Sequence, residues 1–334
     1  MIALKIILPS KFKEYFYKNY FLIFNKYFFL IHNRHLNKLN FFSHFYFILV
    51  TKKIINFIPL DNINFFLYSY KKVFLLFDYK NNLVFKIGFG RGREIVRNNF
   101  VNLSFLNKIK INIIPAPYKI NTIKKLIISS EKYLLGSNCS PLNQSLYRSV
   151  INSCSKIYRN NLLKISMFDH KKSLLKKAKH FYEQGLINRN VFIKISIALK
   201  PSSFDKKNIS NLTYIHGDLT SKNIVIKNNN IFLIDFDRFQ VNFPELDVIT
   251  LLLFDLSKDY TNYFSLLNDP DFLNQFKKLT KILYEFNPEF SCNSANHETI
   301  LGYYRIWMAL NYYDDAAYNP DLLKYKNKIN FYLY

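Results

Sequence analysis

Residues 214–237, YIHGDLTSKNIVIKNNNIFLIDFD, constrain this chain more than any other segment does. The runs NIVIK and IFLIDF are short and apolar, and the asparagines between them predict a tight turn, so the two runs are expected to form a hairpin. Asp218 lies on the loop before the hairpin, Asn223 begins its first strand, and Asp235 lies at the end of its second. A hairpin can therefore bring these three polar side chains to one edge.

Two carboxylates and an amide at one edge suit a particular chemistry. A carboxylate and an amide oxygen are hard ligands, of the kind that bind Mg²⁺ together with phosphate oxygens. A second carboxylate beside them can accept a proton from a hydroxyl nucleophile. Phosphoryl transfer requires little more than a metal, positioning and cationic neutralisation. The segment therefore favours phosphoryl transfer.

Two of its motifs resemble those of a known family. HGDLTSKN resembles the HxDxxxxN catalytic loop of aminoglycoside phosphotransferases and choline-kinase-like enzymes, which are small-molecule relatives of the protein kinases. LIDFD resembles the metal-binding segment of the same family. The resemblance implies an α+β, bilobal protein-kinase-like fold. Its N-lobe would be a small antiparallel sheet with one helix, and its C-lobe would be larger and mainly helical.

The resemblance also implies roles for individual residues. Asp218 would be the catalytic base, and Asn223 and Asp235 would bind Mg²⁺, with ATP as the co-substrate. His216 would hold the catalytic loop in place, and Asp247, which opens the apolar stretch DVITLLLF, would support that loop.

Further matches lie in the expected N-lobe. Lys86 in LVFKIG is at a strand end, where the family places its phosphate-binding lysine. Glu94 in the following helix would pair with that lysine, although an acid at a helix N-terminus is also favoured by the helix dipole alone. The main chain of Glu131, Lys132 and Tyr133, in SSEKYLLG, would contact adenine at the hinge between the lobes.

The chain departs from the family pattern before Lys86. The family's nucleotide loop precedes that strand, but YSYKKV contains no glycine. GFGRG, with Gly88, Gly90 and Gly92, follows instead, and we interpret it as a strand-to-helix connection, with a phosphate contact as the alternative. Asp237 either caps a turn or orients a second metal ion, and the turn is favoured.

Three regions are expected along the chain of 334 residues. Residues 1–62 would be an aromatic, basic extension packed on or continuous with the N-lobe, which would span residues 63–135 and bind the nucleotide. Residues 136–334 would be the C-lobe, with the catalytic loop and the acceptor site. Strands are expected in INFFLYSY, KVFLLFDY, NLVFKIGF, INIIPAPYKI and IKKLIISSEKYLLG, and helices in RGREIVRNNFVNLSFLNKI, SLLKKAKHFYEQG, ELDVITLLLFDLS, NQFKKLTKILYEF and ETILGYYRIWMALNYY.

The net charge of +24 has two explanations. It could mark a surface for nucleic acid or an anionic membrane, or it could reflect a coding bias towards Lys, Asn, Ile, Phe and Tyr. The even spread of the positive residues favours coding bias. Three cysteines without a CxxC pair indicate a reducing compartment, and a cytoplasmic location is expected. The aromatic runs near the N-terminus are too short and too polar for a transmembrane helix; they predict buried helix or strand, with peripheral membrane contact as the alternative.

The leading hypothesis is an ATP- and Mg²⁺-dependent kinase that phosphorylates a hydroxyl of a small molecule. The acceptor could be a sugar, a surface-glycan precursor, an amino alcohol such as choline, or an aminoglycoside. The basic composition favours a neutral or anionic acceptor over a polycation. A catalytically idle nucleotide-binding protein is the main alternative, against which the intact set of Asp218, Asn223 and Asp235 argues. No recognisable motif supports a specific nucleic-acid partner.

Overall fold

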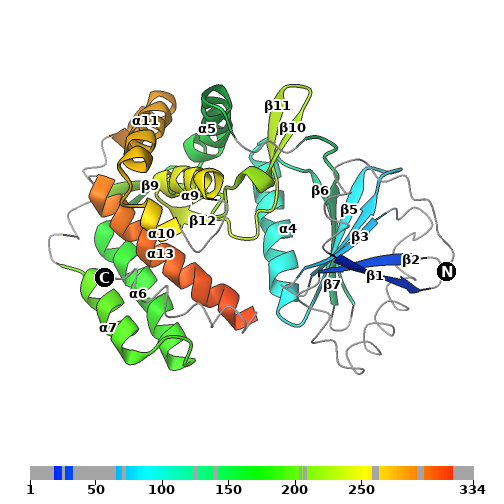
Figure 1. Cartoon of the computed structure of the whole chain (residues 1–334), viewed down its shortest axis with the longest axis horizontal. Coiled ribbons are helices and arrows are strands. Elements are labelled where there is room, and N and C mark those ends of the chain that lie inside the picture. Colours follow the sequence, from blue (N-terminus) through cyan, green and yellow to red (C-terminus); the bar gives the residue numbers. More distant parts are fainter. Residues whose placement is uncertain are drawn as a thin grey trace. The chain divides into compact units, whose positions relative to one another are not determined.

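The computed structural model describes residues 19–24, 27–32, 65–69, 73–123, 126–137, 142–202, 205, 209–257, 263–291 and 297–318 (Figure 1). The chain divides into two compact units. The first comprises residues 1–97 and 117–133, and the second comprises residues 98–116 and 134–334. The expected division into lobes of residues 63–135 and 136–334 stays a prediction.

The first unit is built on a seven-stranded sheet with the order β1-β2-β3-β4-β5-β7-β6. Its strands are β1 (Asn19–Phe24), β2 (Tyr27–His32), β3 (Phe65–Ser69), β4 (Val73–Asp78), β5 (Leu83–Phe89), β6 (Pro117–Ile123) and β7 (Leu126–Lys132). All neighbours pair antiparallel except β2 and β3, which pair parallel. Strands β1 and β2 come from the N-terminal extension, so part of that extension continues the sheet.

Helix α4 (Gly92–Lys108) follows β5 after a tight turn. Gly90 has a φ of 54° in this turn, a value that glycine adopts without the steric cost of a side chain. Apolar residues on one face of α4, among them Val96, Leu103 and Leu106, are fully buried. The helix begins in the first unit, and its residues from Asn98 onwards belong to the second.

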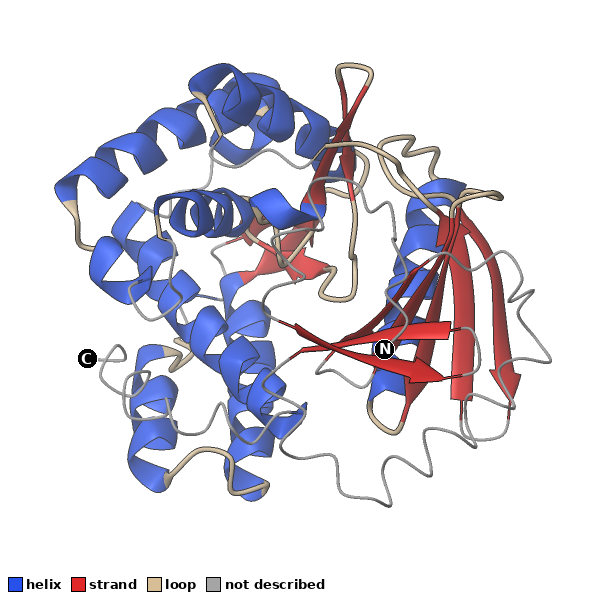
Figure 2. Ribbon diagram, turned by 45° about the vertical axis from the view of Figure 1, so that its right-hand side comes forward, coloured by secondary structure: helices blue, strands red, loops and turns tan. Residues whose placement is uncertain are grey.

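The second unit is mainly helical (Figure 2). Its helices are α5 (Gln144–Arg159), α6 (Met167–Glu183), α7 (Arg189–Ala198), α9 (Glu245–Leu256), α10 (Tyr263–Leu266), α11 (Pro270–Phe286), α12 (Pro288–Ser291) and α13 (His297–Tyr318). A three-stranded sheet has the order β12-β9-β8, formed by β8 (Leu163–Ser166), β9 (Ile209–Ile215) and β12 (Gln240–Asn242). The hairpin of β10 (Ile224–Lys227) and β11 (Asn230–Leu233) is separate from it.

Asparagine and glycine residues form two of the turns in the second unit. Asn228 and Asn229 join β10 to β11 with φ values of 50° and 60°, as a two-residue hairpin turn of type I′ requires. Helix α6 ends just before Gly185, whose φ is 70°. Both the hairpin and this helix end are confirmed predictions.

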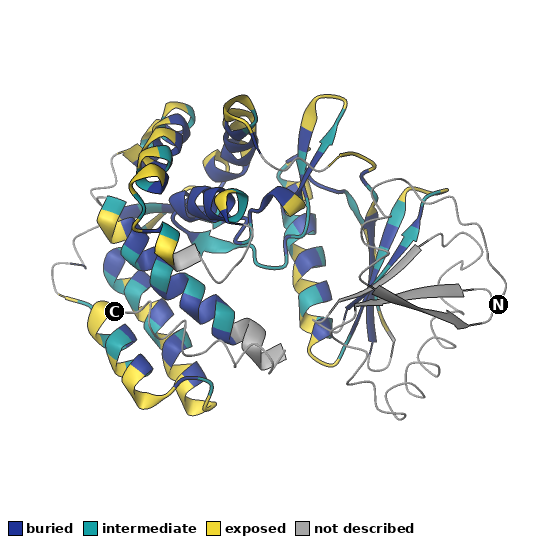
Figure 3. Ribbon diagram, in the orientation of Figure 1, coloured by how far each residue is buried: buried dark blue, intermediate teal, exposed yellow. Residues whose placement is uncertain are grey.

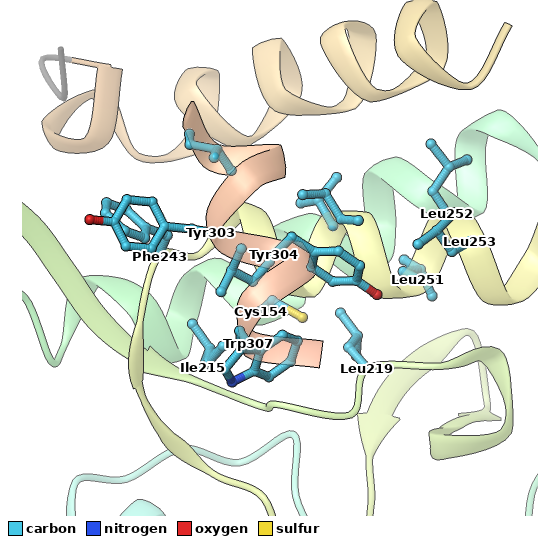
Figure 4. Close-up of a cluster of buried hydrophobic side chains, with 14 of the residues drawn as sticks. Cys154, Ile215, Leu219, Phe243, Leu251, Leu252, Leu253, Tyr303, Tyr304 and Trp307 are labelled. Atoms are coloured by element: carbon cyan, nitrogen blue, oxygen red, sulfur yellow. The ribbon is translucent and has the colours of Figure 1, made fainter. Parts of the chain in front are cut away.

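The core of the second unit surrounds helix α9, whose residues 245–253 are all buried (Figure 3). Trp307 and Tyr304 of α13 lie in the same cluster as Ile215, which precedes the predicted catalytic loop, and Leu219, which lies within it (Figure 4). Trp307 is only 1% exposed. The residue before the loop and one residue within it are therefore packed in the core.

The predicted fold class is confirmed by this arrangement of a small sheet-based unit and a larger helical unit. The sequence did not predict α5, α7 or β8, and β6 begins only at Pro117, later than the expected run INIIPAPYKI. Among the described residues, no helix is both long and apolar enough to cross a membrane.

Candidate active site

The loop between β9 and β10 rests on a buried carboxylate. Asp247 lies in the first turn of α9 and is completely buried. Its Oδ2 accepts hydrogen bonds from the backbone N–H of His216 at 2.7 Å and from the hydroxyl of Tyr158 at 2.9 Å. Its Oδ1 accepts one from the backbone N–H of Gly217 at 2.9 Å. Asp247 therefore contacts the loop as the resemblance implies.

Burial has an electrostatic consequence for this carboxylate. Desolvation raises the pKa of Asp247 above its ordinary value, although His216, Gly217 and Tyr158 stabilise the charged form and oppose the change. Burial and the neighbouring Asp247 also raise the pKa of Tyr158 well above its ordinary value, so its hydroxyl remains a hydrogen-bond donor. Tyr158 is a site residue that the sequence did not reveal.

His216 joins the loop to the segment that follows β11. Its Nδ1 accepts a hydrogen bond from the backbone N–H of Asp218 at 3.3 Å. The other ring nitrogen, Nε2, therefore carries the hydrogen and donates to the carbonyl oxygen of Ile234 at 2.9 Å. Ile234 immediately precedes Asp235. A single imidazole thus links the residue expected to be the base with the residue that precedes the expected metal ligand.

Asn223 makes a second connection between the same two segments. Its Nδ2 donates to the backbone carbonyl of Asp218 at 2.8 Å and to the Oδ2 of Asp218 at 3.3 Å. Its own backbone carbonyl accepts from the N–H of Ile234 at 3.0 Å. Because the amide nitrogen faces two oxygens of Asp218, the side-chain oxygen of Asn223 is the atom left to bind a cation.

The segment that follows β11 approaches the loop closely at Gly217. Gly217 has a φ of 79°, and an added Cβ would overlap the backbone carbonyl of Arg238. Asp235 also has a positive φ, 66°, which costs energy for a residue with a side chain and persists only where the surroundings enforce it. Asp237 and Arg238 form a turn. The turn interpretation of Asp237 fits this position, but its role is not tested.

The donor set fits Mg²⁺. The structure brings Asp218 and Asn223 into contact and bonds Asn223 to the residue before Asp235, so the candidate ligands are carboxylate and amide oxygens. The described residues contain no group of three or more His, Cys, Asp or Glu side chains that could hold a metal ion. A site made of Asp235 and the oxygen of Asn223 needs further oxygens, which nucleotide phosphates would supply.

In the first unit, the structure gives Lys86 a different partner from the expected one. The Nζ of Lys86 lies 3.2 Å from Oε1 of Glu131, and both side chains are largely buried. Glu94 is in the first turn of α4 and is exposed. The pairing follows from the sheet: Lys86 lies opposite Ser129, and Glu131 is two residues further along β7, on the same face.

The expected hinge residues lie at the end of β7. Glu131 and Lys132 pair with β5, and the backbone N–H of Tyr133 donates to the carbonyl of Asn82 at 2.7 Å. That N–H is thus bound within the first unit, and the adenine contact remains a prediction. An added Cβ on Gly88 would overlap the backbone of Gly92. This close packing is typical of a strand-to-helix connection, and a phosphate contact of this glycine-rich turn remains untested.

Comparison with known proteins agrees with these observations. Residues 198–278 match the model of the phosphotransferase enzyme family. This match contains the predicted catalytic loop, the hairpin and the first turn of α9, and it confirms the resemblance drawn from HGDLTSKN and LIDFD. No curated protein matches the chain.

Solved structures extend the similarity to most of the chain. An aminoglycoside 2′-phosphotransferase in its GDP complex is similar with a TM-score of 0.55 at 13% identity, over 86% of this chain and 96% of that one. The chain has a protein-kinase-like fold. A fructosamine-3-kinase homologue from Haemophilus somnus has a TM-score of 0.53 at 16% identity, over 81% of this chain and 92% of that one. An amicoumacin kinase in complex with AMP-PNP and Ca²⁺ has a TM-score of 0.52 at 13% identity, over 81% and 88% of the two chains.

Proposed function

We propose that this kinase-like chain is an ATP- and Mg²⁺-dependent phosphotransferase that moves the γ-phosphate of ATP to a hydroxyl of a small molecule. The main support is the contact of Asp218 with Asn223 and the bonding of Asn223 to the segment that carries Asp235. The match to the phosphotransferase family over the same residues supports the same reaction.

In this proposal, Asp218 is the base. It accepts the proton of the acceptor hydroxyl while the acceptor oxygen bonds to the γ-phosphorus, the bond to the bridging oxygen breaks, and ADP leaves. Asn223 and Asp235 hold Mg²⁺, which when bound neutralises the charge of the phosphates. His216 and Asp247 act on the backbone of the loop, so they are positioning residues.

The first unit contributes the proposed nucleotide contacts. Lys86 would bind phosphate, and the main chain of residues 131–133 would bind the base, as the resemblance implies. Glu131 replaces Glu94 as the proposed partner of Lys86, because it forms the observed ion pair.

The acceptor is proposed to be neutral or anionic, such as a sugar or a surface-glycan precursor, because the net charge of +24 disfavours a polycation. An aminoglycoside or a choline-type alcohol is the alternative acceptor. Dependence on ATP and the scarcity of cysteine both fit a cytoplasmic enzyme.

The test combines transfer with binding. The protein is incubated with Mg²⁺, γ-labelled ATP and panels of neutral sugars, sugar phosphates, amino alcohols and aminoglycosides. We expect transfer to a neutral or anionic acceptor. In the Asp218→Asn variant, kcat should fall on the order of 10²- to 10⁴-fold, with nucleotide affinity, measured by calorimetry, close to that of the wild type. Asp271→Asn, at an exposed position of α11, is the matched control.

Two outcomes would contradict the proposal. Wild-type turnover in Asp218→Asn would remove this residue from its role as base. Tight binding of Mg²⁺–ATP without transfer to any acceptor in the panels would instead support an idle nucleotide-binding protein.

A further inference from the structure

Asp235 has a backbone conformation that few residues other than glycine adopt. Its φ of 66° lies in the left-handed region, which Asp tolerates better than most residues because its short polar side chain can form local hydrogen bonds. Such a conformation persists where neighbouring contacts leave the chain no alternative. The contacts of the residues on either side of Asp235 therefore help to place its carboxylate.

The residue before Asp235 is fixed by the catalytic loop. The N–H of Ile234 donates to the backbone carbonyl of Asn223 at 3.0 Å, and its carbonyl accepts from Nε2 of His216 at 2.9 Å. Both backbone polar groups of Ile234 are thus bound by residues of the loop.

The residue after Asp235 is fixed by helix α4. The N–H of Phe236 donates to Oδ1 of Asn99 at 2.9 Å. The carbonyl of Phe236 accepts from Nδ2 of Asn102 at 2.7 Å. Asn99 and Asn102 are three positions apart, so they lie on one face of the helix. Two amides of one helix thus bind both backbone polar groups of Phe236, the residue that follows Asp235.

The same face of α4 also makes apolar contacts with this region. The ring centroid of Phe105 lies 5.4 Å from the ring centroid of Tyr214 and 6.3 Å from that of Phe239. The ring centroids of Phe236 and His216 are 4.5 Å apart. This packing does not depend on the two amides, so their removal should release the backbone of Phe236 without detaching the helix. Asn99 is only 1% exposed, and a buried amide on an apolar helix face needs a partner.

We propose that Asn99 and Asn102 are positioning residues that hold the Asp235 carboxylate in place for the metal ion, so that helix α4 sets the affinity of the site for metal. The inference rests on the proposed function, in which Asp235 is a metal ligand. Partners that orient a ligand from outside the coordination sphere commonly change metal affinity or activity by about 10- to 100-fold when they are removed.

The experiment compares Asn99→Ala, Asn102→Ala and the double variant with Asn98→Ala. Asn98 is an exposed asparagine on the same helix, so it controls for the gain in helix propensity. Calorimetry measures the affinity of Mn²⁺ for the protein saturated with AMP-PNP. A second measurement gives the Mg²⁺ concentration for half-maximal turnover. The melting temperature of each variant is recorded alongside.

We expect Asn98→Ala to behave as the wild type. The double variant should bind Mn²⁺ about 10-fold more weakly or worse, and excess Mg²⁺ should restore most of its turnover. A loss of melting temperature with an unchanged metal affinity would mean that the amides are only structural, and it would overturn the inference. If the double variant does not fold, the partly exposed Asn102 provides the decisive single variant.

Asp235→Ala separates this inference from the proposed function. It should abolish metal binding in the presence of AMP-PNP, and excess Mg²⁺ should not restore turnover. If Asp235→Ala binds metal as the wild type does, the proposed function fails at this residue. If Asp235→Ala loses the metal but Asn102→Ala and the double variant keep wild-type affinity, only the role of helix α4 fails.

Discussion

The two units hold their candidate functional residues in different ways. In the second unit, Asp218, Asn223 and the neighbours of Asp235 are bound to one another by hydrogen bonds between side chains and backbone. In the first unit, Lys86 lies in the middle of strand β5 and contacts Glu131 on the neighbouring strand β7. The first arrangement connects residues close together in the sequence, whereas the second depends on which strands are neighbours.

This difference explains why one partner could be predicted and the other could not. A loop followed by a hairpin fixes the surroundings of Asp218 within about two dozen residues of sequence. The partner of Lys86 is set by the register of β5 against β7, in which Lys86 lies opposite Ser129. Nothing in the sequence near Lys86 gives that register. The family resemblance instead placed the partner of Lys86 in the following helix, at Glu94, which is exposed in the structure.

The largest expected effect is at Gly217, where the loop meets Arg238. Gly217→Ala would place a Cβ against a backbone carbonyl and would also force a positive φ on alanine. We expect the free energy of unfolding to fall by more than about 4 kcal/mol, a value seen only for a few kinds of substitution. Denaturant titration followed by circular dichroism measures the loss.

Gly185→Ala is the matched control for this variant. Gly185 has a similar φ of 70°, but no atom lies within 4 Å of an added Cβ. Gly185→Ala should therefore lose only the stability that a positive φ costs an alanine, about 1–2 kcal/mol. If both variants lose the same stability, the close approach of the loop and the metal segment is not a constraint, and the second unit is less tightly connected than we describe.

The next effect tests the ion pair of the first unit. Lys86 and Glu131 are only 8% and 6% exposed, and removing one member of a buried pair leaves a charge that water cannot reach. Glu131→Gln should therefore lower the free energy of unfolding by about 3 kcal/mol. Glu94→Gln should leave stability close to that of the wild type, because Glu94 is exposed. Chemical unfolding of both variants at one pH measures the difference.

The same two variants test the nucleotide site. If Glu131 orients Lys86 towards phosphate, Glu131→Gln should raise the KM for ATP and Glu94→Gln should not. A larger effect from Glu94→Gln on either stability or KM would restore the pairing expected from the family and remove the contrast between the units.

The sequence predicted more of the second unit than of the first for a physical reason. Asp218, Asn223 and Asp235 belong to one loop and hairpin, whose geometry can bring them to one edge, and Asp247 was expected to support the loop because of the family resemblance. Asn99 was missed, although it interrupts the apolar stripe that contains Val96 and Leu103 on the inner face of α4. A polar residue at such a position is a signal for a buried hydrogen bond. The donor to Asn99, however, is the backbone N–H of Phe236. This residue lies more than a hundred positions away in the sequence, so the pattern around Asn99 cannot identify it.

The smallest expected effect concerns pH and a second acid in the first turn of α9. The carboxylate of Asp247 accepts hydrogen bonds from His216, Gly217 and Tyr158. The equally buried Glu245 accepts a hydrogen bond at 2.7 Å from the hydroxyl of Tyr284. Desolvation raises the pKa of Glu245 from 4.5 to about 7, against the opposing effects of its backbone hydrogen bond and of Tyr284. Because the pKa is higher in the folded state, the folded protein binds the proton more tightly than the unfolded chain does.

The stabilisation from the protonated Glu245 is therefore complete below pH 4.5 and is lost as the pH rises through about 7. Glu245→Gln cannot ionise, so it should keep this stabilisation at high pH. The unfolding free energy of the variant relative to the wild type should rise between pH 5 and 8 by at most about 3 kcal/mol. Taking the difference removes the contribution of Asp247, whose raised pKa has the same sign and is present in both proteins.

The control for this last measurement is Glu285→Gln. Glu285 is 43% exposed and pairs with Arg148 on the surface, so its substitution should give a difference from the wild type that does not change with pH over this range. Unfolding is measured in denaturant at half-unit pH steps at constant ionic strength. A flat difference for Glu245→Gln would show that Glu245 is already charged when folded. The first turn of α9 would then hold Glu245 as a buried carboxylate, against the raised pKa that its desolvation predicts.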